Sequence, residues 1–136
     1  MCGNLSLQQY IFGNIKMPQF DLQKHDLRSL NRVLQDQKKE TNELSWEVIN
    51  PKGSHAIAVG IDAPIEVIIS GSTGYYCGGM NQHANITVKG SVGPGVAENM
   101  MSGKVVIEGD ASQYAGATGQ GGLLVIKGNA SSRCGI

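Results

Sequence analysis

The chain has 136 residues, of which 40% are hydrophobic and 16% charged, and its eleven basic residues balance its eleven acidic ones. This balance argues against the basic surface that proteins binding nucleic acids or anionic membranes present. No apolar run approaches the ~20 residues that a transmembrane helix requires.

Residues 1–20 have mixed composition and are treated as an N-terminal extension of unclear role. Their one apolar patch, at residues 10–12, shows no regular period. The start of the chain also lacks a basic segment followed by an apolar one, so we expect no secretory signal. With three cysteines and no CxxC pair, the sequence predicts a reduced, cytoplasmic protein without a disulfide framework.

Residues 21–45 are expected to hold a helix and a linker. Apolar residues recur there at the spacing of one helical face, at Leu27, Leu30, Val33 and Leu34. Asp26 is the expected N-cap of a helix over residues 26–40. Basic side chains are expected on its solvent side, at Arg28, Arg32, Lys38 and Lys39.

Residues 46–136 are built from a repeat of 19 residues. Glycines recur at that interval, at Gly71, Gly90, Gly109 and Gly128, and a second small residue follows each by seven positions, at Gly78, Ala97, Gly116 and Gly135. An apolar triplet precedes each glycine of the first set. A period near 20 is typical of a solenoid.

The repeat predicts an all-β fold, a single-stranded right-handed parallel β-helix with coils of about 19 residues. No leucine-rich frame and no six-residue subperiod is present. Two interior columns of side chains are expected, one of Val67, Ile86, Val105 and Leu124 and one of Ile69, Val88, Ile107 and Ile126. The small residues should mark corners with positive φ or close approach between coils.

The two ends of the solenoid are predicted to differ. Residues 46–60 are interpreted as an irregular first coil with Gly53 and Gly60 in the glycine positions, covered by the helix. The last coil stops at Ile136 within a repeat, so we expect a truncated solenoid. Its uncovered strand edge could pair with a further coil, with a partner or with a second copy.

Residues 20–136 resemble the glycine-repeat (GXGXG) domain at the C-terminus of the glutamate synthase large chain. Residues 90–103 (GSVGPGVAENMMSG) match a turn of that family, and residues 109–122 and 128–135 resemble the two coils that follow it. Residues 20–22, 27–31 and 50–53 are more similar still to the stand-alone subunit of N-methylglutamate synthase and related complexes. One of the subunits of formylmethanofuran dehydrogenase is a more distant resemblance.

The resemblance implies a non-catalytic scaffold subunit or domain in a nitrogen-metabolism complex of the glutamate synthase type. FMN and an iron–sulfur cluster would belong to a flavin synthase subunit, and glutamine hydrolysis to an amidotransferase subunit. No catalytic, cofactor-binding or metal-binding residue is implied for this chain. An independent β-helix module that binds a small ligand is the alternative of another class.

Cys2 supports a third interpretation, because amidotransferases of this pathway begin with Met-Cys-Gly, as this chain does, and use the cysteine as nucleophile. That enzyme fold needs a β-sandwich for which this chain has no room before its helix. We therefore interpret Cys2 as a remnant rather than an active nucleophile.

The remaining candidates favour structural roles. Cys77 and Cys134 share a repeat position three coils apart, ~14 Å at the spacing of β-strands, so we expect free thiols. The glycine runs 93–95 and 116–122 lead into β segments rather than a helix, which argues against a dinucleotide site. Isolated histidines at positions 25, 55 and 83 favour no metal site. Two interpretations stay open for Tyr75, Tyr76, Met100 and Met101: exposed apolar contacts with a partner, or side chains that fill a wide corner of the solenoid.

Overall fold

A computed structural model describes residues 8–12, 15–37 and 45–136 of the chain. Seven strands form one sheet in chain order, and each strand from β2 to β7 runs parallel to the next. The strands are β1 (Gln8–Phe12), β2 (Ile15–Asp21), β3 (Ser45–Ile49), β4 (Glu66–Ser70), β5 (Asn85–Val88), β6 (Lys104–Ile107) and β7 (Leu123–Ile126).

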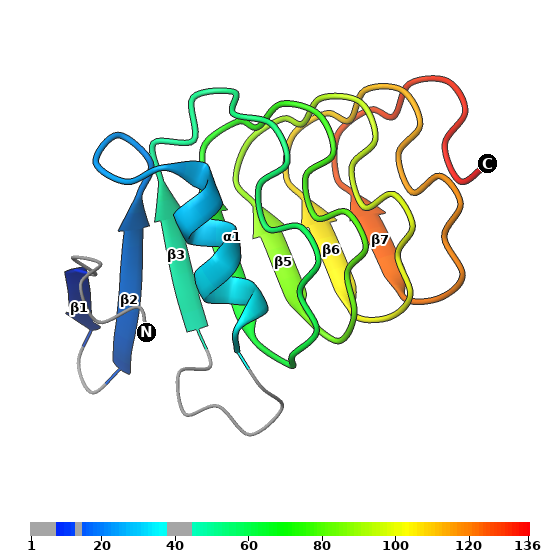
Figure 1. Ribbon diagram of the computed structural model, residues 1–136. Helices are drawn as coiled ribbons and strands as arrows, with labels where there is room; N and C mark the ends of the chain where they lie inside the picture. The colour runs from blue at the N-terminus through cyan, green and yellow to red at the C-terminus, as the bar shows by residue number, and fades with distance from the viewer. Residues whose placement is uncertain (1–7, 13–14, 38–44) are drawn as a thin grey trace.

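After each strand from β3 to β6 the chain crosses to the opposite side and returns before it enters the next strand (Figure 1). We call the wall formed by these returning segments the return wall. The coils form a right-handed superhelix as they advance from β3 to β7 (Figure 1). The predicted right-handed parallel β-helix, with one strand in each coil, is therefore confirmed.

Residues 15–20, to which the sequence assigned no clear role, form a strand of the sheet together with Asp21. β2 pairs with β3 in parallel through residues 19–21, and β1 pairs with β2 in the antiparallel direction. Phe20, which belongs to β2, is fully buried. The sheet therefore begins before the first coil of the repeat.

The predicted helix is present as α1 (Leu27–Gln35), and Asp26 is its N-cap. The Asp26 carboxylate accepts a hydrogen bond from the Ser29 backbone N–H at 2.7 Å. Bonds from the Ser29 side chain and backbone hold the pKa of Asp26 below its usual value. The helix ends at Gln35 and not at residue 40, since the N–H of the C-cap residue Asp36 closes the last turn on Arg32.

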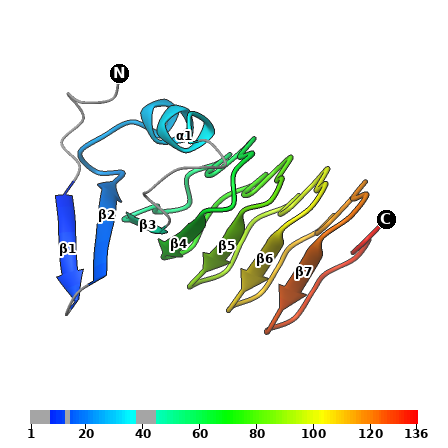
Figure 2. The ribbon, with the colours of Figure 1, turned by 90° about the horizontal axis from the view of Figure 1, so that it is seen from below.

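α1 lies at the N-terminal end of the stack, on the side of the return wall (Figure 2). Its apolar face buries Leu30, Val33 and Leu34. Asn31 forms three hydrogen bonds with the first coil: it donates to the Ala56 carbonyl at 2.8 Å and accepts from the N–H groups of Ala58 at 2.9 Å and Val59 at 3.3 Å. The helix therefore covers the first coil, as predicted.

Both predicted interior columns are present in the sheet register. Val67, Ile86, Val105 and Leu124 align on successive strands, and so do Ile69, Val88, Ile107 and Ile126. All but the last member of each column are buried. Leu124 and Ile126, on the last strand of the described residues, are partly exposed.

The first coil differs from its prediction, and the assignment of Gly53 and Gly60 to the glycine positions is wrong. Asn50 and Ala58 take the places equivalent to Gly71 and Gly78, each with positive φ. The reason is the length of the coil. Trp46 pairs with Val67 and Asp62 with Gln82, so the interval is 21 and then 20 residues before it settles at 19 from Glu66.

The glycine column after the strands is required by close approach between coils. A Cβ added to Gly90 would lie 2.7 Å from the backbone carbon and oxygen of Gly71. The same addition at Gly109 would lie 2.7 Å from the Gly90 oxygen, and at Gly128 it would lie 2.5 Å from the Gly109 oxygen. Each coil thus crosses the one below it where only glycine leaves enough space.

Candidate functional site

The return wall has an unusual backbone, in which alternate residues take the left-handed conformation. Three such residues occur in each of four coils, with φ between 55° and 75°: Ala56, Ala58 and Gly60; Tyr76, Gly78 and Met80; Gly95, Ala97 and Asn99; Tyr114, Gly116 and Thr118. The predicted corner column of small residues is the middle member of each of the last three sets. A Cβ on Gly78 would point inward, 3.4 Å from Ile86.

Hydrogen bonds between coils hold this backbone in place. The N–H groups of Tyr76 and Met80 donate to the next coil, at Pro94 and Glu98, whereas that of Gly78 donates back to Ile57, all at 2.8–2.9 Å. The alternation lets one short segment bond to both neighbours. Non-glycine residues such as Tyr76 and Tyr114 adopt this conformation at a cost of roughly 1–2 kcal/mol each.

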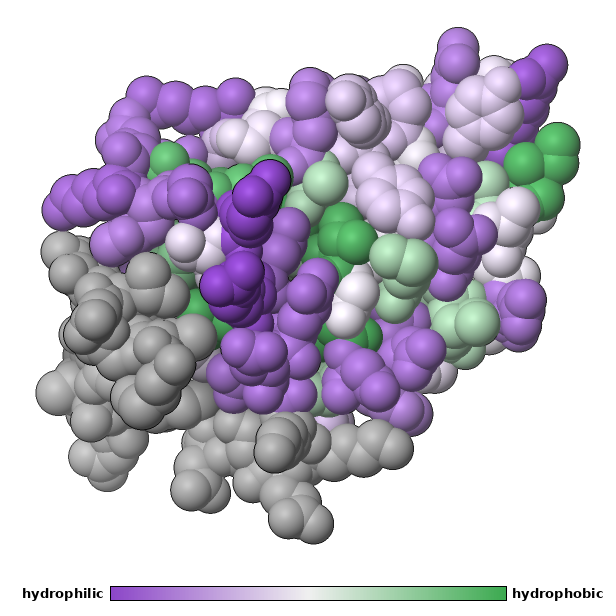
Figure 3. All heavy atoms as spheres, in the orientation of Figure 1, coloured by the Kyte–Doolittle hydropathy of each residue, from purple (hydrophilic) through white to green (hydrophobic). Residues whose placement is uncertain are grey.

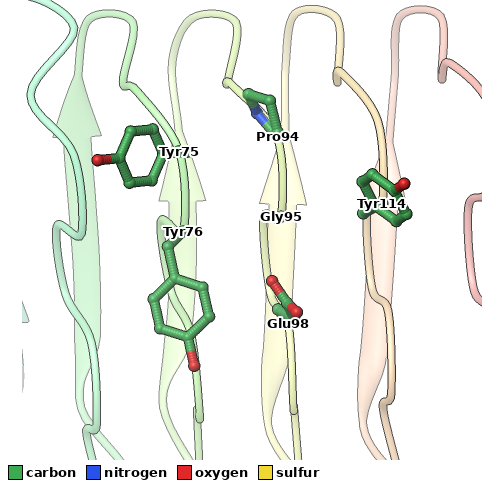
Figure 4. A pocket seen from close by; sticks show the side chains of 6 residues that line it. All are labelled: Tyr75, Tyr76, Pro94, Gly95, Glu98 and Tyr114. Carbon is green, nitrogen blue, oxygen red and sulfur yellow. The ribbon is translucent and has the colours of Figure 1, made fainter.

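The outer side of the return wall carries a groove of about 410 Å³ (Figure 4). Six residues from three successive coils line it: Tyr75, Tyr76, Pro94, Gly95, Glu98 and Tyr114. Five of these residues offer apolar or aromatic surface, and Glu98 adds a carboxylate. The sequence pointed to Tyr75 and Tyr76 as contact residues but gave no sign that Tyr114 and Glu98 would join them.

Neighbouring side chains position each tyrosine ring of the groove. The Tyr75 ring stacks on His55 with centroids 3.7 Å apart, and its backbone N–H donates to His55 Nδ1 at 3.0 Å. The Tyr76 hydroxyl accepts a hydrogen bond from the Asn99 side chain. The Tyr114 hydroxyl accepts from Arg133, whose guanidinium lies 5.3 Å from the ring centroid. The rings are therefore fixed by contacts with other coils.

A second hollow of about 270 Å³ lies further along the return wall, between Met80, Gln82, Asn99, Met101, Thr118 and Gln120. The two methionines that the sequence offered as contact candidates differ in position. Met101 is exposed beside this hollow, whereas Met100 is buried in the core. In Figure 3, the hydrophilic side chains of α1 stand beside a paler, more apolar part of this wall. On the face that Figure 3 shows, the apolar groups of the return wall are thus exposed mainly in the coils that follow the one covered by α1.

Cys77 and Cys134 are free thiols in one column, as predicted. Val96 and Ala115 lie between them, and backbone bonds join their coils in order. Burial raises the pKa of the Cys77 thiol from 9.0 to about 12, although a hydrogen bond with Thr73 acts in the opposite direction. The Cys77 thiol therefore stays protonated to a higher pH in the folded state than in the unfolded chain. Its contribution to the free energy of unfolding is complete below pH 9 and is lost as pH rises towards 12.

We expect the two thiols to differ in reactivity. In a Cys2→Ser background at pH 8, Cys134 should react with an aromatic disulfide reagent, and Cys77 at least about 100-fold more slowly because it is buried and protonated. Counting released thiolate before and after addition of guanidinium measures this. Two fast thiols in the folded chain would contradict the buried position of Cys77.

The three histidines lie apart, and among the described residues no group of three histidine, cysteine, aspartate or glutamate side chains could hold a metal ion. His25 packs near Phe20, and His55 packs under Tyr75. His83 lies 3.6 Å from Asp62, with the Ser102 hydroxyl 3.4 Å from its other ring nitrogen. Both side chains of the His83–Asp62 pair are about half exposed, and solvent screens such a contact.

The glycine runs at 93–95 and 116–122 lie where neighbouring coils approach closely. A Cβ on Gly93 would lie 2.7 Å from the Gly74 backbone, and one on Gly121 would lie 2.5 Å from the Met101 oxygen. The run at 116–122 leads directly into β7, with no helix after it. A dinucleotide site needs a helix N-terminus there.

Comparison with known proteins gives one curated relative. The chain is similar to Protein GlxC of Rhizobium meliloti (strain 1021). The two are 68% identical over 88 residues, which cover 65% of this chain and 39% of that protein. The chain thus matches well under half the length of Protein GlxC. No protein-family model and no solved structure matches the chain, and no helix of the described residues is long and apolar enough to cross a bilayer.

Proposed function

We propose that the chain is a non-catalytic scaffold subunit or domain of a cytoplasmic flavoenzyme complex of the glutamate synthase type. The observation that carries the proposal is the backbone of the return wall. Residues 76–80, 95–99 and 114–118 each repeat a left-handed residue at alternate positions, and this is the conformation for which glycine is best suited. A GXGXG pattern places glycine at the same alternate positions. The backbone therefore supports the resemblance to the glycine-repeat domain of glutamate synthase.

The surroundings of the reactive side chains also support a scaffold role. Cys77 is buried and protonated at neutral pH, and the His83–Asp62 contact is open to solvent. The glycines that could suggest a nucleotide site are used for contacts between coils. Cys2, which the amidotransferase interpretation would use as nucleophile, lies outside the described residues.

In this proposal the chemistry resides in partner subunits. A flavin synthase subunit would hold FMN and an iron–sulfur cluster, and an amidotransferase subunit would release ammonia from glutamine. The chain would pack beside them and hold them in register. Its rigidity suits that task, because every coil is hydrogen-bonded to the next on both the strand side and the return wall.

The groove on the return wall favours a second candidate function, a module that binds a small ligand. Three tyrosines and one carboxylate from three successive coils line it. A ligand that binds only the folded chain would raise its melting temperature. The two functions are compatible, since a scaffold can also carry a ligand site.

Co-expression tests the scaffold proposal. The tagged chain is produced with and without a flavin synthase subunit and an amidotransferase subunit from the same genome. We expect the partners to co-purify with the tag and to bring a flavin absorbance spectrum, while the chain alone stays colourless. If the two partners form a fully active complex without the chain, or if the tag never retains them, the scaffold proposal is wrong.

A further inference from the structure

A column of side chains runs along the return wall through four successive coils, at Tyr76, Gly95, Tyr114 and Arg133. Backbone bonds define it, since Tyr76 N–H donates to Pro94, Gly95 N–H to Gln113 and Tyr114 N–H to Ser132. All four residues are left-handed. Gly95 is the member without a side chain, so a slot opens between Tyr76 and Tyr114, whose backbones lie two coils, or ~10 Å, apart.

The carboxylate of Glu98 lies at the base of this slot. A Cβ added to Gly95 would be 2.7 Å from Glu98 Oε2, so the carboxylate occupies the space that a side chain at position 95 would need. Figure 4 shows Glu98 beside Gly95, with Tyr76 and Tyr114 on the two flanking coils. Glu98 is half-buried, and its side chain has no hydrogen bond or ion pair with any other described residue.

The contact between Tyr114 and Arg133 shows that an aromatic side chain of this column can hold a cation. The Arg133 guanidinium lies 5.3 Å from the ring centroid and donates to the Tyr114 hydroxyl. A cation thus already faces one aromatic side chain of the column. The negative face of an aromatic ring attracts a cation in this way.

We propose that the slot between Tyr76 and Tyr114 binds an organic cation of the alkylammonium class, with Glu98 as its counter-ion. An anion would be repelled by Glu98, and a neutral apolar group would desolvate the carboxylate without a partner. The groove that these residues line, about 410 Å³, is also large enough to admit a small alkylammonium ion.

The inference does not depend on the scaffold role, because binding is measured on the isolated chain. Choline and its neutral carbon isostere, 3,3-dimethylbutan-1-ol, are titrated separately, and the amide signals of Gly95 and Ala97 are followed by ¹H–¹⁵N NMR. We expect choline to shift these signals and to bind at least about tenfold more tightly than the isostere. Equal binding of the two compounds, or shifts confined to another part of the chain, would overturn the proposal.

Two matched variants test the role of the carboxylate. Glu98→Gln keeps the shape of the side chain and removes its charge, and we expect choline affinity to fall about tenfold. Glu108→Gln is the control, because Glu108 is exposed in the segment directly after β6, and it should leave the affinity unchanged. Spectra of both variants check that the fold is intact, and unchanged affinity in a folded Glu98→Gln chain would contradict the proposal.

The cation can come from a free amine or from the side chain of another protein, and peptides separate these sources. Gly-Lys-Gly and its trimethyl-lysine form are compared with choline, and a norleucine peptide is the neutral control. If choline binds more tightly than its isostere and a lysine peptide binds more tightly still, the slot is assigned to a protein side chain, whereas binding of choline alone would assign it to a small amine. If neither binds more tightly than its neutral control, the cation site is excluded.

Discussion

Replacing Gly90 with alanine is expected to lower the free energy of unfolding by about 3 kcal/mol, near the upper end for overpacked sites. The added methyl carbon would lie 2.7–2.8 Å from backbone atoms of Gly71 and Ser72. Backbone atoms cannot move aside as a flexible side chain can, because hydrogen bonds hold both coils. The whole stack must therefore shift locally to admit the methyl group. Equilibrium unfolding in urea, followed by far-UV circular dichroism, measures the change.

Gly119→Ala is the matched control for Gly90→Ala. A methyl carbon at Gly119 would have its nearest neighbour at 3.3 Å, the Gly116 carbonyl oxygen, at an exposed position. The loss of backbone freedom in the unfolded chain partly offsets this contact, so we expect a change below about 1 kcal/mol. Similar losses in the two variants would show that the glycine column is not set by close approach between coils.

Ile107→Ala is expected to lower the free energy of unfolding by about 3–4 kcal/mol. Ile107 is fully buried in β6, with Val88 and Ile126 aligned on the neighbouring strands. Neighbours above and below are fixed by the sheet register, so they cannot close the cavity that the smaller side chain leaves. Thermal and urea unfolding of the purified variant measure the loss.

The neighbouring residue provides the control for Ile107→Ala. Val106 belongs to the same strand but points to the outer side of the sheet, where it is only half-buried beside Thr87 and Val125. Val106→Ala should cost about 1 kcal/mol or less. Equal costs at the two positions would contradict the assignment of the inner and outer faces of β6.

The period of 19 residues predicted the interior of the solenoid because the coils from Glu66 onward have equal length. Equal coils place residues such as Val88 and Ile107 in one column by arithmetic alone. The first coil has one extra residue before Gly53 and another after Asp62. A sequence period cannot place such insertions, because only hydrogen bonds between coils decide which residues are equivalent.

The candidate site was less predictable than the core. Tyr75 and Tyr76 were visible as neighbouring aromatic residues, but Glu98 and Tyr114 lie one and two coils further on and carry no local signal. Their meeting depends on Gly95, whose missing side chain leaves the Glu98 carboxylate room against the backbone. Such an arrangement follows from the register of three coils together.

Local spacing along the chain was enough to predict the solenoid, its interior columns, the N-cap of α1 and the small residues of the corners. The three-dimensional contacts were needed to show that residues 15–21 join the sheet, that α1 ends at Gln35 and that the slot forms between Tyr76 and Tyr114. These features depend on how one coil lies over the next. That relation is set by hydrogen bonds and backbone contacts between segments far apart in the chain.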